Sequence, residues 1–194
     1  IYSTATLRAT NTFTLSANRG ITFGHVNGPS IEVDSSRTLT YAGVLGGDAE
    51  WNKKGAGVLA LTGTANTNKG RVSIQAGTLQ IAADGSLGAV PAAAAEKINI
   101  WSTGTLEANA TISLNANRRI ELGTVAGPRV SVTAGNTLTY GGLISGSANW
   151  SKEGTGTLTL TGGISTASGT LIANAGTVLF LGTNTAQGVG VGVS

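Results

Sequence analysis

The sequence predicts an all-β fold in which short parallel strands coil into a β-solenoid of roughly eight or nine coils, with about 20 to 25 residues in each coil. Three observations support this prediction. The chain repeats itself without a gap, each repeat alternates apolar and polar residues, and glycine is abundant where charge is scarce. Alternation with a period of two is the signature of a strand that buries one face.

The internal repeat has a spacing of 99 residues. Residues 38–41 recur with identical sequence as residues 137–140, and Trp51 recurs as Trp150. A long duplication without gaps favours a stack in which each unit contacts mainly its neighbours. The predicted organisation is a single continuous β-solenoid over residues 1–194, with copy one at 1–82, a connecting loop at 83–97 and copy two at 98–194.

Short alternating segments follow one another along each copy. The clearest in copy one are residues 12–17, 30–34, 38–41, 57–61 and 78–81. Each ends at Gly, Asn, Asp or Ser, which favour turns. Residues 89–97 differ, because their alanine-rich run could form one helical turn after Pro91.

Alternation alone fits a sandwich, a barrel or a solenoid, since all three have one apolar and one polar face. Tight hairpin signals are scarce in this chain. Asn27 and Gly28 run straight into Pro29, and Asp84 and Gly85 stand nearly alone. The shortage of hairpin turns favours parallel coils over antiparallel hairpins.

Composition excludes several other classes of protein. The chain has 30 glycines among 194 residues, 11% charged residues and no cysteine. The absence of cysteine excludes a disulfide scaffold and a thiolate metal site, and no apolar run reaches the length of a membrane span. The net charge of +3 comes from scattered basic residues rather than a patch, which disfavours nucleic-acid binding. Because the chain begins at Ile1 without methionine or a signal peptide, we expect a processed or excised segment of a longer protein.

Two stretches carry a family resemblance. Residues 49–82 and 148–181 follow a pattern close to G-x-L-x-K-x-G-x-G-T-L-x-L-x-G, then a polar turn, then T-x-V-x-A-G-T-L, and so resemble the autotransporter-associated β-strand repeat. The matching positions are Lys53, Gly55, Gly57, Leu59, Leu61, Gly63, Gly70, Ala76, Gly77, Thr78 and Leu79 in copy one, and Lys152, Gly154, Gly156, Thr157, Leu158, Leu160, Gly162, Gly169, Ala175, Gly176 and Thr177 in copy two.

The resemblance implies a right-handed parallel β-helix in a secreted or surface-anchored bacterial passenger. That family is associated with adhesion, export or structural extension and has no shared enzymatic activity. We therefore expect a non-enzymatic, extracellular or cell-surface module of a large surface protein or fibre. Its expected partner is itself or an adjacent repeat, through end-to-end stacking of coils, with a cell-surface or extracellular glycan as a further candidate.

Two sets of structural residues are predicted from the strand pattern and the turns. Inward-facing positions should form a stacked core, and glycines should occupy the corners of the coils. The predicted core stack contains Leu59, Leu61, Leu79, Leu158, Leu160, Trp51 and Trp150, and the predicted corner glycines are Gly55, Gly57, Gly63, Gly77, Gly154, Gly156, Gly162 and Gly176.

No catalytic, cofactor-binding or metal-ligating residue is predicted. Glu32 and Asp34 share the outer side of one strand, a spacing that suits an acid pair or a weak calcium site, but copy two has Ser131 and Thr133 there. We interpret the acids as a solvated strand face. Asp48 and Glu50 receive the same interpretation, because copy two has Ser147 and Asn149 at those positions.

The remaining candidates also favour structural roles. His25 is the only histidine and is predicted in a surface turn, which supports no catalytic triad. The glycine-rich residues 55–57 and 154–156 lack the G-K-[ST] ending of a phosphate loop. Residues 188–192 are interpreted as a loosely patterned strand or tail.

The aromatic and basic residues leave one alternative function open. The two tryptophans could bind a glycan if exposed, so the alternative is a glycan-binding or glycan-cleaving β-helix domain. Tyr41 and Tyr140 each follow a leucine by two residues, which places them on the same side of the strand, so both are predicted to face inward. The duplicated basic residues are expected at strand edges, where their long side chains would cover the corners and neutralise free carbonyls or acids. These are Arg19, Arg118, Lys53 and Lys152.

Overall fold

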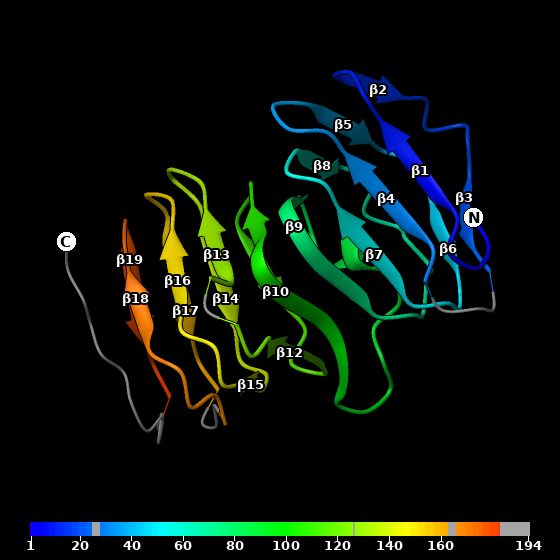
Figure 1. Ribbon diagram of the computed structural model, residues 1–194. Coiled ribbons are helices and arrows are strands. Elements are labelled where there is room, and N and C mark those ends of the chain that lie inside the picture. The colour runs from blue at the N-terminus through cyan, green and yellow to red at the C-terminus, as the bar shows by residue number, and fades with distance from the viewer. Residues whose placement is uncertain (25–27, 126, 163–165, 183–194) are drawn as a thin grey trace.

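The computed structural model describes residues 1–24, 28–125, 127–162 and 166–182. The chain forms a stack of strands with β1, β2 and β3 at one end and β18 and β19 at the other (Figure 1). Its elements are β1 (Thr6–Ala9), β2 (Phe13–Leu15), β3 (Ile21–Phe23), β4 (Ser30–Val33), β5 (Thr38–Tyr41), β6 (Leu45–Gly47), β7 (Trp51–Lys54), β8 (Val58–Leu61), β9 (Val72–Ile81), the 3₁₀ helix η1 (Asp84–Leu87), β10 (Ala95–Ala108), β11 (Ile112–Leu114), β12 (Arg118–Leu122), β13 (Arg129–Val132), β14 (Thr137–Tyr140), β15 (Ile144–Gly146), β16 (Trp150–Glu153), β17 (Thr157–Leu160), β18 (Leu171–Ala173) and β19 (Thr177–Phe180).

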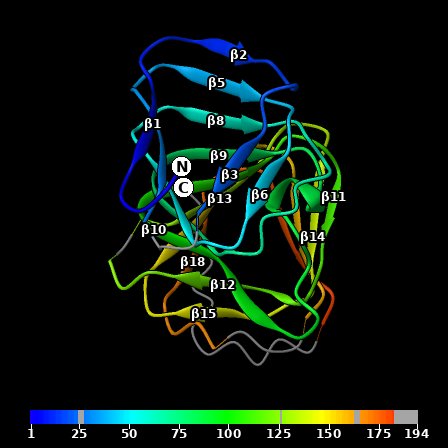
Figure 2. The ribbon, with the colours of Figure 1, turned by 90° about the vertical axis from the view of Figure 1, so that its right-hand side faces the viewer.

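The strands coil into a three-sided solenoid of about seven turns, close to the number predicted. On the first face β1, β4, β7 and the start of β9 follow one another, and on the second face β2, β5, β8 and the end of β9 do so. The third face begins with β3 and β6. All strand pairings in the described part of the chain are parallel, which confirms the predicted parallel β-solenoid, and Figure 2 shows the strands arranged around a common core.

Two long strands each run across a corner and so belong to two faces. Residues 72–74 of β9 pair with β7, whereas residues 78–81 pair with β8. Between them lies Gly77, whose φ of 64° lets the backbone turn without ending the strand. Strand β10 repeats this arrangement one layer higher, pairing with β9 along both segments.

The two copies are offset by one face of the solenoid. Strand β4 lies on the first face, but its counterpart β13 pairs with residues 105–108 of β10, which pair with residues 78–81 of β9 on the second face. Likewise β12, the counterpart of β3, pairs with residues 98–100 of β10 on the first face. The chain between the copies therefore adds one strand segment beyond a whole number of turns, and copy two is turned by one face.

The core is a column of inward-facing side chains from successive coils. Each inward side chain rests on its counterpart in the next layer, as Leu39, Leu59 and Leu79 do along the second face. The tryptophan side chain of Trp51 stacks on Phe23, with ring centroids 4.9 Å apart and an interplanar angle of 9°. All seven predicted core residues are at least nine-tenths buried in the structure: Trp51, Leu59, Leu61, Leu79, Trp150, Leu158 and Leu160.

The segment between the copies differs in detail from its prediction. The helical turn lies at η1, before Pro91 rather than after it, and β10 already begins at Ala95. Ser86 and Leu87 of η1 are buried. In the coil that contains β9, η1 takes the place of a strand on the third face. Within the described residues, no helix is long and apolar enough to span a membrane.

Candidate functional site

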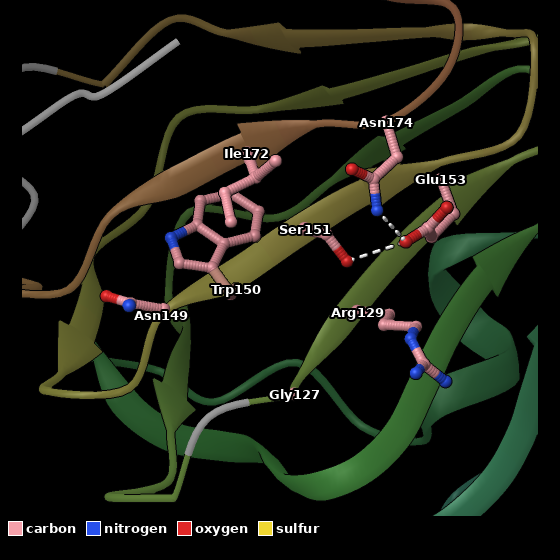
Figure 3. Close-up of a pocket in the computed structure, with 8 residues that line it drawn as sticks. All are labelled: Gly127, Arg129, Asn149, Trp150, Ser151, Glu153, Ile172 and Asn174. Carbon is pink, nitrogen blue, oxygen red and sulfur yellow. Dashed lines mark hydrogen bonds between the residues drawn. The ribbon is translucent and has the colours of Figure 1, made fainter. Parts of the chain in front are cut away.

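A shallow hollow of about 310 Å³ lies on the outer side of copy two (Figure 3). It forms where β13, β16 and β18 run side by side, because alternate residues of these strands point outward. Trp150 and Lys152 point inward, which leaves Ser151 and Glu153 on the outside. The lining residues are Gly127, Arg129, Asn149, Trp150, Ser151, Glu153, Ile172 and Asn174.

We name this hollow the lateral groove. Its lining is polar, and one apolar side chain is exposed on it. Glu153 Oε1 accepts hydrogen bonds from Ser151 Oγ and Asn174 Nδ2, both at 2.7 Å. Arg129 is exposed beside them, and Ile172 contributes an apolar surface. Trp150 is only 5% exposed, so its ring is not presented for stacking on a ligand.

The groove offers hydrogen-bonding groups without the elements of glycoside hydrolysis. Glu153 is the one carboxylate among its eight lining residues. Hydrolysis of a glycosidic bond ordinarily requires two carboxyl groups facing each other across the bond. The groove can therefore bind polar ligands, but it holds no carboxylate pair.

The acids singled out in the sequence are paired with basic residues on the outer surface. Arg8 Nε lies 2.9 Å from Asp34 Oδ1 and 3.5 Å from Glu32 Oε1. These contacts raise the pKa of Arg8, chiefly through its hydrogen bond to Asp34. The acids thus neutralise a strand neighbour, and no cluster of three or more potential metal ligands occurs in the residues that the structure describes.

The second pair of acids is split between two partners. Asp48 Oδ1 lies 3.4 Å from Lys69 Nζ, and Glu50 Oε2 lies 2.9 Å from Arg71 Nη2. Arg71 also donates to Glu96, so it links the first copy to the start of β10. This ion-pair chain crosses the layers at the junction between the copies.

Lys53 and Lys152 lie inside the solenoid, which corrects their expected place at a strand edge. Lys53 Nζ donates to the carbonyl oxygens of Lys54, Gly55 and Ala76 at 2.8–3.0 Å. Lys152 Nζ donates to those of Gly154 and Ala175. Each ammonium group thus holds two successive corners together, and the signal was present in the sequence: Lys53 shares the inward parity of Trp51.

Burial lowers the pKa of Lys53 to about 8, while the nearby carboxylate of Glu32 acts in the opposite direction. Burial also lowers the pKa of Lys152. Three carbonyl oxygens accept from Lys53 Nζ and two accept from Lys152 Nζ, which makes the buried ammonium groups tolerable.

Arg19 and Arg118 occupy equivalent positions but have different surroundings. Arg19 is exposed, whereas Arg118 is fully buried against η1. Arg118 donates through Nε and Nη2 to the two carboxylate oxygens of Asp84, at 2.9 and 3.0 Å, and through Nη1 and Nη2 to three backbone carbonyls. Comparison of the two copies in the sequence does not reveal these contacts, because Arg118 meets residues of the preceding coil, 29 to 34 residues earlier along the chain.

The aromatic residues are mostly structural. The hydroxyl groups of Tyr41 and Tyr140 reach the carbonyl oxygens of Arg19 and Arg118, at 2.5 and 2.7 Å, and burial raises the pKa of both tyrosines. Trp101, the counterpart of Tyr2, is 37% exposed. Trp101 is therefore the most exposed of the tryptophans.

The predicted corner glycines fall into two groups. Positive φ values occur at Gly55, Gly77, Gly154 and Gly176, whereas Gly57, Gly63, Gly156 and Gly162 have none. At all eight positions a Cβ atom would collide with the backbone of the adjacent coil, so close packing alone requires glycine in the second group, as at Gly162 against Gly141. The first group therefore has two reasons for glycine, positive φ and close packing of coils, and the second group has only the close packing.

The two ends of the stack expose apolar side chains. We name β1 and β2 the N-terminal edge, where Leu7 is 36% and Phe13 is 44% exposed. We name β18 and β19 the C-terminal edge, with Ile172, Leu179 and Phe180 also 36–42% exposed. His25 and residues 188–192 lie outside the described residues.

The chain was compared with known proteins. Residues 52–81 and 151–180 match the passenger-associated-transport-repeat. The chain is 30% identical over 171 residues to the adhesin BmaC autotransporter of Brucella suis biovar 1 (strain 1330), a match that covers 84% of this chain and 5% of that protein. No solved structure matches. Autotransporter adhesins with passenger repeats are surface-exposed or secreted, which confirms the predicted location.

Proposed function

Because this chain carries two passenger-associated-transport repeats, we propose that it is a non-enzymatic segment of a surface adhesin, in which a rigid solenoid extends and displays binding surfaces outside the cell. The observation that carries this proposal is the continuous parallel stack from β1 to β19. Backbone hydrogen bonds and a buried core column connect every layer, as a spacer under tension requires. Residues 1–194 form a single continuous solenoid in this proposal.

An adhesion assay tests the proposal. Beads coated with residues 1–194 should bind host cells or extracellular matrix more than beads coated with a solenoid of similar size and charge from an unrelated family. Equal binding by both bead types would contradict an adhesive role. Turnover of a polysaccharide by the purified chain would contradict the non-enzymatic part.

The lateral groove supports a second candidate, binding of a glycan. Arg129, Asn149 and Asn174 offer donors and acceptors for hydroxyl or carboxylate groups, and Ile172 offers an apolar contact. At the corresponding places in copy one, Arg129 is replaced by Ser30, Ile172 by Ser73 and Asn174 by Gln75. The groove chemistry therefore belongs to copy two.

Glycan binding is tested with matched variants of the two copies. On an array of surface glycans, Arg129→Ala and Asn174→Ala should each lower binding by about tenfold, the loss of roughly one hydrogen bond to a charged or polar group. Gln75→Ala should leave binding unchanged. Equal loss in all three variants, or no binding by the unmodified chain, would remove this candidate.

A further inference from the structure

One tryptophan lies on the outside of the solenoid in the middle of the stack. Trp101 belongs to β10, which pairs with β9 on one side and with β12 on the other (Figure 1). Ile98 and Ile100 of the same strand point inward and are fully buried, so Trp101 points outward. It is 37% exposed although paired coils flank it on both sides. This exposure therefore does not arise at an end of the stack.

The indole ring of Trp101 rests on the backbone of the next coil. A Cβ atom added at Gly123, just after β12, would lie 2.8 Å from Trp101 Cε3 and 3.3 and 3.4 Å from its Cδ2 and Cζ3. Tyr2, the counterpart of Trp101, lies in the same way over Gly24, the counterpart of Gly123. The glycine thus supports one side of the ring, and the exposed part of the ring forms a flat apolar surface of fixed orientation.

An irregularity in β10 directs this ring. Three steps of the chain separate Ile100 from Thr103, whereas only two separate their partners on β9, so Trp101 and Ser102 face a single residue. Ser102 has a φ of 41° and its counterpart Ser3 has 55°, a left-handed conformation that residues with side chains rarely adopt. Bulges and strained backbone occur often beside binding sites, where they re-aim a side chain.

Polar side chains border the ring. Thr103 is exposed on the same strand, and Thr124 is exposed directly after the glycine that supports the ring. Glu121 lies two residues before that glycine, on the outward side of β12, and is partly exposed. The neighbouring exposed apolar residue is Val125, at 59%. The apolar surface is therefore about one indole ring and one valine wide, with hydroxyl and carboxylate groups at its rim.

We propose that Trp101 binds the flat face of a neutral pyranose with equatorial hydroxyl groups, whose rim is hydrogen-bonded by Glu121 and Thr124. Such a sugar carries its C–H bonds on the two faces and its hydroxyl groups around the rim, which matches an aromatic ring bordered by polar groups. The carboxylate of Glu121 would repel an anionic sugar. A stable protein interface buries about 800 Å² on each partner, far more than this apolar surface offers.

The inference deepens the proposed function, on which it rests, by naming a ligand class and a site other than the lateral groove. Binding is tested by titrating the chain with the β-1,4-linked tetrasaccharides of glucose and of N-acetylglucosamine in the millimolar range. Trp51 and Trp150 are only 1% and 5% exposed, so fluorescence reports mainly on Trp101. At least one tetrasaccharide should change the emission and protect it from quenching by acrylamide.

Substitution of the ring tests whether it is the binding surface. Trp101→Ala should weaken tetrasaccharide binding at least tenfold, measured by calorimetry, because the apolar surface that contacts the sugar is lost. The control Val44→Ala removes another exposed apolar side chain, 45% exposed on a different coil, and should bind like the unmodified chain. Circular dichroism shows whether each variant is folded.

A second variant displaces the ring without removing it. Gly123→Ala adds a methyl group whose three nearest atoms all belong to Trp101, so the ring must move while the backbone keeps its place. Binding should fall at least about fivefold, and the thermal midpoint should stay close to that of the unmodified chain. Gly20→Ala is the matched control, because a Cβ atom there meets nothing within 4 Å.

The outcomes separate this inference from the proposed function. The inference would be overturned if the unmodified chain bound neither tetrasaccharide, or if folded Trp101→Ala and Gly123→Ala bound as tightly as the unmodified chain. Loss of binding in Arg129→Ala but not in Trp101→Ala would assign the sugar to the lateral groove and overturn it as well. Bead adhesion without tetrasaccharide binding would leave the proposed function intact, whereas tetrasaccharide binding without bead adhesion would contradict the proposed function alone.

Discussion

At the scale of single residues, Lys53 shows how a charge can serve inside the core. Its Nζ is held by three carbonyl oxygens from two successive corners, but burial lowers the pKa of Lys53 to about 8. In the unfolded chain the same group titrates near 10.5. Between these values the unfolded chain binds more protons than the folded chain, so the contribution of Lys53 to stability rises with pH.

This sign gives a prediction for pH dependence. The free energy of unfolding of the unmodified chain, relative to that of Lys53→Met, should increase between about pH 8 and pH 10.5 and stay constant below pH 8. Urea denaturation at several pH values measures it. Lys54→Met, which alters an outward neighbour, should leave the pH slope unchanged. A difference that falls with pH would contradict the inferred titration.

A second prediction separates backbone strain from collision at glycines. Gly135 and Gly176 have nearly equal φ values, 74° and 71°. A Cβ atom at Gly135 meets nothing within 4 Å, but at Gly176 it would strike the carbonyl oxygens of Gly154 and Gly156. Gly135→Ala should cost about 1 kcal/mol for the left-handed conformation, and Gly176→Ala at least about 2 kcal/mol more. Chemical denaturation that gives equal losses would refute the collision.

At the scale of elements, η1 and the start of β12 form one buried polar contact. Arg118 is surrounded by Asp84 and the carbonyl groups at the end of η1, while Arg19 is exposed. The planar guanidinium group reaches both carboxylate oxygens and the carbonyls together, which a lysine ammonium cannot do.

The expected consequence is a large difference between two equivalent substitutions. Arg118→Lys should lower the free energy of unfolding by about 3 kcal/mol, because it breaks a buried ion pair and leaves buried carbonyl groups without donors. Arg19→Lys should change it by less than about 0.5 kcal/mol. Thermal denaturation compares the two, and similar losses would show that the η1 contacts contribute little.

Strand β10 supplies a third matched pair, at the junction of the copies. Leu106 is fully buried between β9 and β13, and its counterpart Leu7 is 36% exposed at the N-terminal edge. Leu106→Ala should cost about 2–5 kcal/mol through lost burial and a cavity, while Leu7→Ala should cost less than about 1 kcal/mol in the monomer. Calorimetry measures both losses, and equal losses would contradict this prediction.

At the scale of the whole molecule, the one-face offset governs what an array of such units would present. A surface that lies on one face of the solenoid in copy one has its counterpart in copy two on the next face. Units of this length joined in a row would therefore rotate their equivalent surfaces stepwise around the rod. A long passenger built this way would expose every type of surface on every side.

Much of this architecture could be predicted from the sequence. The 99-residue spacing and the alternation of residues such as Leu59 and Leu61 were enough for parallel coils, because stacking requires each strand to bury the same face in every layer. The outward position of Glu32 and Asp34 follows from the same parity. Their partner Arg8 does not, since it lies one coil away and pairing depends on the register between strands.

The alternation of side chains along a strand also determines that Trp51 and Lys53 face the same side. A lysine inside a core nevertheless goes against the usual preference of charge for water. The sequence by itself therefore determined the repeat, the strand period and the inward positions, because these depend on local spacing along the chain. The tertiary structure alone decided the carbonyl cradle of Lys53, the burial of Arg118, the lateral groove and the one-face offset. Each of these depends on which coil lies above which, a relation that local spacing does not encode.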